Sequence, residues 1–463
     1  MAAFLWRRHT YHWETVISTN GGQSAVEGSR PARRLGPLRA LAYPQFRIFW
    51  AASLVSITSF FMTMIARGWL VLELTDSEFM VTGVNAIGMA PMLAFSVFGG
   101  AIADRANRKL VLIASDVFNF VIVLALAVVI LTDVVEVWHV FALTALHGVG
   151  FSLGMPARAA SVGNLVERQD LASGVALFTT IFSAAMLVGP ALAGYLLAAF
   201  DMGFTFVAAC AVLAPALALL FALRIPRTAG AVGAPQQSTV LGSIVQGFGY
   251  VRRANVLIGL MLMGTVTTVF AMPYQTLLPV FARDILNAGE SGLGWLGAMG
   301  GAGAIAGSIS VAAFSNPRQM KLLMLAGGLA LGVFIALFAV STVFLLSLAL
   351  ALIVGYLLQI FMTSNFTLVQ VISPDYIRGR VLSIRMIAVG IGPVGMVMLG
   401  AAAEEWGAAA ATAMMGLIST GLLVAILLAN SSVRRVDREA ASVSAGSAQE
   451  AVAAEAGDPS GPR

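Results

Sequence analysis

Long apolar stretches alternate with short polar segments along most of the chain. Charge-free stretches long enough to cross a bilayer, which takes about 20 residues, occur at Leu171–Phe200, Met202–Leu223, Ala254–Phe281, Met386–Ala403 and Trp406–Val433. A further 52 residues, Leu322–Ser373, carry no charge and suffice for two crossings with a turn near Ser341. Five more crossings are expected at Phe46–Leu72, Phe79–Ala103, Leu110–Thr132, Val137–Ala157 and Ser291–Ser315. The pattern therefore predicts twelve membrane spans, all helical, because lipid offers no partners for backbone polar groups.

The composition is that of a membrane protein. Charged residues make up 11% of the chain, hydrophobic residues make up 59%, and the mean hydropathy is +0.89. Soluble domains carry about 25% charged residues. The one cysteine, Cys210, excludes an internal disulfide. The N-terminal 40 residues hold no apolar segment ahead of a cleavage site, so we expect the first membrane helix to act as its own insertion signal.

Basic residues predict the orientation of the chain, because they collect on cytoplasmic loops. With twelve spans, all of the 27 lysines and arginines fall on one side except Arg67 and Arg283, which are expected at the outer ends of the first and seventh helices. The opposite side has short, mainly acidic loops, with Glu73, Asp76, Glu78, Asp133, Glu136, Asp201, Glu404 and Glu405. Both termini are therefore expected in the cytoplasm. A basic inner face beside anionic lipid explains the pI of about 9.7 without a nucleic-acid partner.

Two segments 206 residues apart resemble one another: VERQDLASGV at 166–175 aligns with ISPDYIRGRV at 372–381. Each opens a helix with a Gly-Pro pair, Gly189-Pro190 and Gly392-Pro393. We expect two parallel, pseudo-symmetric six-helix bundles, and transporters built from such repeats bind substrate between their halves. The expected organisation is a cytoplasmic arm (1–44), a first bundle (45–223), a cytoplasmic linker with an interfacial helix (224–253), a second bundle (254–433) and a disordered tail (434–463).

Charge is concentrated in the predicted loop between the second and third helices, GGAIADRANRKL at 99–110. The twelve predicted helices, the linker after the sixth and this loop together resemble the major facilitator superfamily. In that superfamily the loop between the second and third helices reads G-x-x-x-D-R-x-x-R-[KR]. The matching residues are Gly100, Asp104, Arg105, Arg108 and Lys109. Asn107 replaces a usual glycine, as a residue that tolerates positive φ.

This resemblance implies a cytoplasmic gate. In the outward-facing state the carboxylate of the loop would cap a helix of the other half, and a guanidinium would pair with a nearby acid. The alternative is that the loop only anchors the chain by its positive charge, a role that Asp104 does not suit.

The predicted fifth helix contains AAMLVGPALAGY at 184–195. It is similar to the G-x-x-x-G-P-x-x-G-G pattern of major facilitator antiporters that export drugs and other small molecules. Gly189, Pro190 and Gly194 match, whereas alanine stands at two glycine positions. Because proline bends a helix and small residues allow close approach, we expect this helix to bend and pack against the other half. Ordinary close packing is the alternative.

The fourth helix departs from the pattern of proton-coupled exporters, L-x-x-x-R-x-x-Q-G. VFALTALHG at 140–148 puts Thr144 at the arginine position and His147 at the glutamine position. His147 is either a coupling or substrate residue or a neutral packing residue, since ionisable groups within the membrane usually face a cavity or a partner. Asp116 is expected to pair with a basic group such as Arg158. Other polar cavity candidates, which could equally bond a neighbouring helix, are Asn85, Asn119, Gln275, Gln359, Asn365 and Gln370.

The sequence contains little that supports an enzymatic activity. GFSLG at 150–154 satisfies G-x-S-x-G, but that nucleophile turn joins a strand to a helix, whereas this string lies within a predicted helix where Gly150 and Gly154 suit close packing. The sequence contains no metal-ligand cluster, no ATP-binding P-loop and no cofactor motif in a suitable context.

The sequence therefore predicts a secondary active transporter of the bacterial inner membrane, acting as a monomer. It resembles the exporter branch that includes siderophore and macrolide efflux proteins, also through WLVLELTDS before the second helix and SDVFNF in the third. The resemblance implies export of a small organic molecule, drug-like or siderophore, by alternating access with a proton as counter-ion. The alternatives are uptake or facilitated diffusion on the same fold, and a transport-inactive membrane adaptor.

Overall fold

The computed structural model describes residues 36–105, 107–225, 248–252, 254–314 and 316–436, and the elements in these ranges are all helices. The N-terminal half contains α1 (Pro44–Thr75), α2 (Glu78–Arg105), α3 (Arg108–Leu131), α4 (Val137–Leu165), α5 (Leu171–Ala199) and α6 (Met202–Ala222). Two short 3₁₀ helices accompany them, η1 (Gly36–Ala42) and η2 (Arg168–Asp170).

The C-terminal half begins with a crossing made of five consecutive segments. These are α8 (Asn255–Val266), the π-helical η3 (Thr267–Ala271), the 3₁₀ helix η4 (Met272–Leu277), α9 (Leu278–Val280) and the π-helical η5 (Phe281–Ile285). Then follow α10 (Gly289–Ala313), α11 (Pro317–Val340), α12 (Phe344–Ile372), α13 (Asp375–Gly390), α14 (Gly392–Trp406), α15 (Ala408–Ala429) and the short η6 (Val433–Arg435). Prolines at the start of η4, α9 and α14 account for the interruptions, because proline removes a backbone donor.

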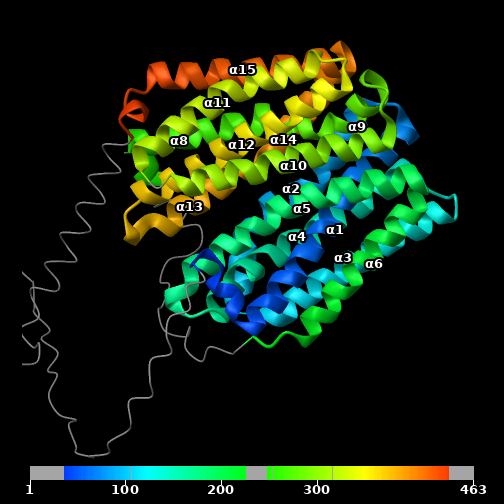
Figure 1. Ribbon diagram of the computed structural model, residues 1–463, viewed down its shortest axis with the longest axis horizontal. Coiled ribbons are helices and arrows are strands. Elements are labelled where there is room, and N and C mark those ends of the chain that lie inside the picture. The colour runs from blue at the N-terminus through cyan, green and yellow to red at the C-terminus, as the bar shows by residue number, and fades with distance from the viewer. Residues whose placement is uncertain (1–35, 106, 226–247, 253, 315, 437–463) are drawn as a thin grey trace, which may run out of the picture. The chain divides into compact units, whose positions relative to one another are not determined.

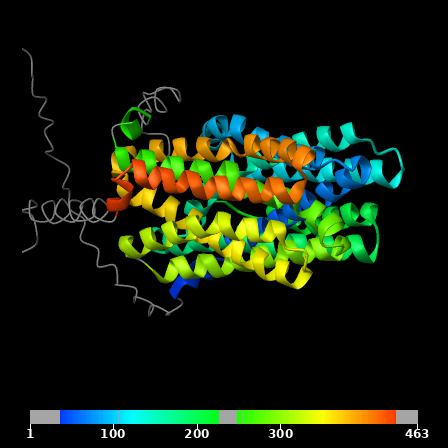
Figure 2. The ribbon, with the colours of Figure 1, turned by 90° about the horizontal axis from the view of Figure 1, so that it is seen from above.

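The prediction of twelve helical membrane spans is confirmed in the described part of the chain. Eleven crossings are long and apolar enough to span a membrane, with α8–η5 and α13–α14 each counted as one, and the 28-residue α2 is the twelfth. Figures 1 and 2 show the long helices of each half running side by side, and in Figure 1 those of the N-terminal half are inclined to those of the C-terminal half. Most of the expected linker (226–247), the arm before Gly36 and the tail after Val436 lie outside the described residues.

The turns between helices gather at two opposite ends. We call the end with the α2–α3, α4–α5, α10–α11 and α12–α13 turns the basic end, and the other the acidic end. At the basic end Asn107 caps α3 by accepting a hydrogen bond from the Lys109 backbone N–H, 3.1 Å away. Its φ is −65°, so this position does not use the tolerance of asparagine for a positive φ. A left-handed residue occurs instead at the acidic end, where Asp76 turns the chain with φ of 50°.

The buried apolar side chains form three clusters with different memberships. The largest lies toward the acidic end and combines both halves, for example Trp69 and Leu72 of α1 with Phe281 of η5. The second contains C-terminal-half residues such as Phe361, and the third contains N-terminal-half residues such as Phe178. Among the described residues, the halves therefore share a core at the acidic end and keep separate cores at the basic end.

Small residues bring the two halves together where α5 lies against α10. A Cβ added to Gly294 would lie 2.9 Å from the Gly194 Cα, and one added to Gly297 would lie 3.1 Å from Pro190 Cγ. Gly189 instead faces α1, where an added Cβ would lie 2.8 Å from Phe61 Cβ. The predicted α5 motif thus lies between α1 of its own half and α10 of the other, as close backbone approach requires.

Candidate functional site

A buried ion pair joins α3 to α4 in the N-terminal half. The Asp116 carboxylate accepts a bond from the Arg158 guanidinium through Oδ1 and another from the Ser56 hydroxyl of α1, 2.6 Å from Oδ2. The side chains of Asp116 and Arg158 are 2% and 3% exposed. Because an isolated charge is costly to bury, such a pair persists only when each charge has close partners. One carboxylate therefore connects three helices.

Two glycines of α4 provide the space for Arg158 and for the neighbouring Asn119. A Cβ on Gly154 would lie 2.6 Å from Ser115 Oγ and also collide with the Arg158 guanidinium, and one on Gly150 would collide with the Asn119 carboxamide. The sequence suggested that these glycines form a close-packing face. In the structure the space they leave is filled largely by polar side chains.

A second polar pair lies closer to the acidic end of the same half. Nη1 of Arg67 on α1 lies 2.9 Å from Nδ1 of His147 on α4, and both residues are buried. The Phe60 ring stacks on the imidazole with 5.4 Å between ring centroids. Arg67 was expected at the outer end of its helix. It lies eight residues before that end, so its charge is within the bundle.

One small cavity lies between the Asp116–Arg158 pair and His147. It has a volume of about 10 Å³, and its lining includes Ser56, Asp116, Asn119, His147 and Arg158. That volume is about enough for one water molecule. Asn119 Oδ1 and Arg158 Nη1 are buried and have no hydrogen-bond partner among the described residues, so a water held there would have both a donor and an acceptor to bond. The structure thus places the predicted residues Asp116, Asn119, His147 and Arg158 around a single cavity.

Other polar candidates lie outside this cluster. Gln359 and Asn365 are on α12 of the C-terminal half, where Gln359 Nε2 donates to Thr363 Oγ1 at 3.0 Å and Asn365 Nδ2 donates to the Leu260 carbonyl at 3.0 Å. Asn85 donates to the Val81 carbonyl of its own helix. Asn365 thus bonds a neighbouring helix, the alternative considered for these residues, whereas Gln359 and Asn85 bond within their own helices.

Arg385 is a buried residue that the sequence analysis missed. Its position was grouped with the basic residues expected at a loop, but it lies ten residues into α13 and is 2% exposed. Its Nε donates to Asn365 Oδ1 at 3.2 Å, Nη2 lies 3.7 Å from Met362 Sδ, and Nη1 is buried without a partner among the described residues. Its distance from Pro374 could have revealed this in the sequence. The helix begins just after that proline, so a residue as far along as Arg385 lies well inside the helix.

The predicted gate falls partly outside the described side chains. Gly100, Asp104 and Arg105 are in the last turns of α2, and only their backbone is described. Arg108 Nη1 donates to the Ala160 carbonyl of α4 at 3.0 Å, and Lys109 Nζ donates to the Phe221 carbonyl of α6 at 2.8 Å. These two cations thus hold the start of α3 against helix ends of the same half.

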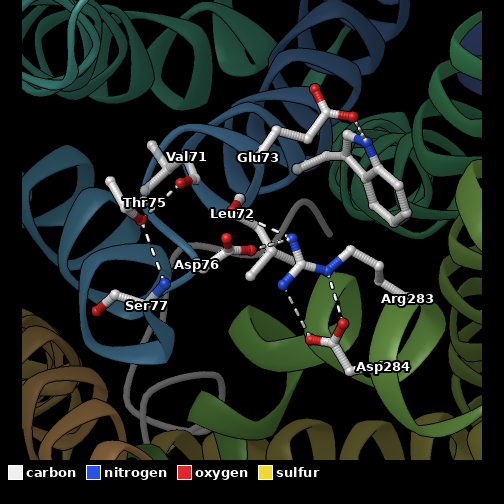
Figure 3. A network of polar contacts seen from close by, with 9 residues as sticks. Val71, Leu72, Glu73, Thr75, Asp76, Ser77, Arg283 and Asp284 are labelled. Carbon is white, nitrogen blue, oxygen red and sulfur yellow. Dashed lines mark hydrogen bonds and ion pairs between the residues drawn. The ribbon is translucent and has the colours of Figure 1, made fainter.

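A set of polar contacts joins the halves at the acidic end. Figure 3 shows Arg283 of η5 between Asp76 and Asp284, with Nη1 2.8 Å from Asp76 Oδ1 and 3.2 Å from the Leu72 carbonyl. Nearby, the Ser77 hydroxyl and the Phe79 backbone N–H both donate to Glu404 of α14, at 2.9 and 3.2 Å. Arg283, an exception to the basic-residue rule, therefore has an acidic partner in the other half.

The sequence pattern of the transmembrane secretion effector family matches residues 34–462. The chain belongs to this major facilitator family. Its members are transporters, so the chain is a multi-pass membrane transporter and not an enzyme.

Relatives and a solved structure agree with this assignment. The multidrug efflux pump Tap of Mycolicibacterium fortuitum is 28% identical over 361 residues, which cover 75% of this chain and 86% of the pump. The enterobactin exporter EntS of Shigella boydii is 25% identical over 393 residues, which cover 83% and 92% of the two chains. A bacterial homologue of the human lysosomal transporter Spinster, in an inward-facing and unoccupied conformation, has the same fold. Its TM-score is 0.62 at 13% identity, over 90% of this chain and 99% of that one.

Proposed function

We propose that this transporter exports a small organic molecule, drug-like or siderophore, across the bacterial inner membrane in exchange for protons. The names of two relatives, a multidrug efflux pump and an enterobactin exporter, support export. The excess of arginine and lysine at the basic end supports a cytoplasmic position for that end and for both termini. A single chain supplies both halves, so a monomer suffices.

Alternating access is supported by the division of the hydrophobic core. A core shared at the acidic end, with separate cores at the basic end, is the packing expected of a state open to the cytoplasm. The reverse state requires the contacts of Arg283 and Glu404 to break while new ones form at the basic end. The predicted gate residues Asp104 and Arg105 lie on the helix end where such contacts would form.

The observation that carries proton coupling is the pairing of His147 with Arg67. Nδ1 can accept a hydrogen bond from a guanidinium only when that nitrogen carries no proton. Protonation would set two cations against one another in a low-dielectric interior, so the contact between α1 and α4 would have to open. The Asp116–Arg158 pair faces His147 across the cavity, and a water there would provide a proton path toward it.

Flux measured in inverted membrane vesicles tests this function. An imposed proton gradient, acidic inside, should drive accumulation of the substrate, and collapse of the gradient should abolish it. Candidate substrates come from the growth of a deletion strain across a panel of toxic compounds and siderophores. Accumulation only in right-side-out vesicles would indicate uptake, and accumulation insensitive to the gradient would exclude proton coupling.

A further inference from the structure

Arg385 is held in a fixed orientation by the C-terminal half. Asn365 is fully buried and donates to the Leu260 carbonyl, so its amide oxygen is directed toward Arg385 Nε. Gly264 of α8 leaves the space for the guanidinium, because an added Cβ would lie 2.8 Å from both Cζ and Nη2. These neighbours contact Nε and Nη2 and leave Nη1 without a partner among the described residues.

The bonds to Arg385 do not neutralise its charge. Its described partners are an amide oxygen and a thioether sulfur, and a thioether is only a weak acceptor. A buried cation with no counter-charge is costly, whereas Arg158 in the other half is matched by Asp116. Nη1 of Arg385 could donate two further hydrogen bonds, and a guanidinium suits the geometry of oxyanions.

Among the described residues, buried positive charges outnumber buried negative charges. Three arginines are buried, Arg67, Arg158 and Arg385, against one aspartate, Asp116. The imidazole of His147 is neutral while it accepts from Arg67, so it does not reduce the excess of two positive charges. The described buried residues therefore offer no unpaired carboxylate to a cationic substrate, whereas Arg385 is a buried cation without a counter-charge among the described residues.

We propose that Arg385 binds an anionic group of the transported molecule, so that the substrates are organic acids rather than organic cations. This inference rests on the proposed function, because it assigns a substrate class to the same transporter. The substrate oxyanion accepts from Nη1 and supplies the counter-charge that the described residues do not.

Two ions of nearly equal shape and opposite charge test the assignment. The carboxylate 2-naphthoate and the ammonium ion 2-naphthylmethylammonium are titrated calorimetrically into the purified transporter in a neutral detergent, with empty micelles as the blank, because the carboxylate can accept a hydrogen bond from Nη1. Wild-type protein should bind the anion saturably and at least tenfold more tightly than the cation. Arg385→Gln should weaken anion binding at least tenfold and leave cation binding within twofold.

Further variants keep the test decisive if Arg385→Gln does not fold. Arg385→Lys retains the charge and should retain the preference for the anion, whereas Gly264→Ala displaces the guanidinium and should reduce it. Arg318→Gln removes an exposed arginine of the same half and should change nothing. Equal affinities in wild type, no saturable anion binding, or an unchanged preference in the Gln and Ala variants would overturn the proposal.

A last titration distinguishes a site for organic anions from a site for inorganic anions. Adding chloride to a chloride-free buffer should leave the affinity for 2-naphthoate within twofold. Competition by chloride at physiological concentration would assign Arg385 to an inorganic anion and overturn the proposed substrate class. None of these titrations measures transport, so absent efflux or absent proton coupling would refute the proposed function while anion binding persisted.

Discussion

The Arg67 guanidinium lies 2.9 Å from the His147 imidazole, although the two residues are 80 positions apart in the sequence. Thr144, which occupies the arginine position of proton-coupled exporters, is one turn from His147 on α4 and its hydroxyl has no described partner. A buried cation therefore does reach this part of α4, but α1 supplies it.

His147→Gln should weaken proton-driven accumulation in inverted vesicles and leave substrate binding measurable. Glutamine can still accept a hydrogen bond from Arg67 but cannot take up a proton. The measurement is initial accumulation against the imposed pH gradient. The matched control is His139→Gln at the start of the same helix, outside the cavity. An unchanged pH profile in His147→Gln would reduce His147 to a packing residue and leave Asp116 as the next candidate.

Asp116→Asn should damage folding and gating more than the pH dependence of transport. It leaves Arg158 buried without its counter-charge, which costs about 3–5 kcal/mol when one partner of a buried pair is removed. Thermal unfolding in detergent measures the loss. The double variant Asp116→Asn with Arg158→Gln should recover part of it, and Asp133→Asn, on an exposed residue, is the control. Full stability in Asp116→Asn would contradict the assigned pairing.

Arg283→Gln should shift the transporter away from the state with a closed acidic end. The ion pair with Asp76 is partly exposed, with side chains 28% and 78% accessible, so we expect a modest effect. Pairs of this kind contribute about 0.2–1 kcal/mol, which is up to about a fivefold change in population. Spin-label distances across the acidic end should lengthen. Asp76→Asn keeps a residue that tolerates the φ of 50° and should lengthen the same distance, and wild-type distances in both variants would argue against a latch.

Asp104→Asn should have the opposite effect at the basic end. If the carboxylate caps a helix only in the outward-facing state, its loss removes about 1.5–3 kcal/mol from that state alone. The ligand-free equilibrium then shifts toward the inward-open state, expression holds and transport falls. Distances between labels across the basic end should increase. Wild-type distances with full transport would show that Asp104 is not part of a gate.

Single cysteines test the orientation of the helices. In a Cys210→Ala background, a cysteine at Thr228 in the linker should react only from the cytoplasm, and one at Thr132 after α3 only from outside. A membrane-impermeant maleimide applied to intact cells and to inverted vesicles distinguishes the two sides. Labelling of both positions from the same side would contradict the twelve-span topology.

Much of the fold could be predicted from the sequence for a simple physical reason. Apolar segments longer than about 20 residues must be helices in lipid, and short polar turns mark where each one ends. The charged loop ending in Arg108 and Lys109 was equally visible, because charge is scarce elsewhere and its spacing is specific. These local features were enough to predict the fold, the family and the number of crossings.

Lateral contacts between the helices were decided only by the tertiary structure. Several helices are apolar on every side, so no polar stripe in the sequence indicates which way each one faces or how deep a residue lies. Arg67 therefore looked like an outer anchor and Arg385 like a loop residue, although both are buried. Gly150 and Gly154 looked like a packing face, yet they leave space for Asn119 and Arg158. Rotation and depth of helices set these contacts, and both depend on packing across the whole bundle rather than on neighbours in sequence.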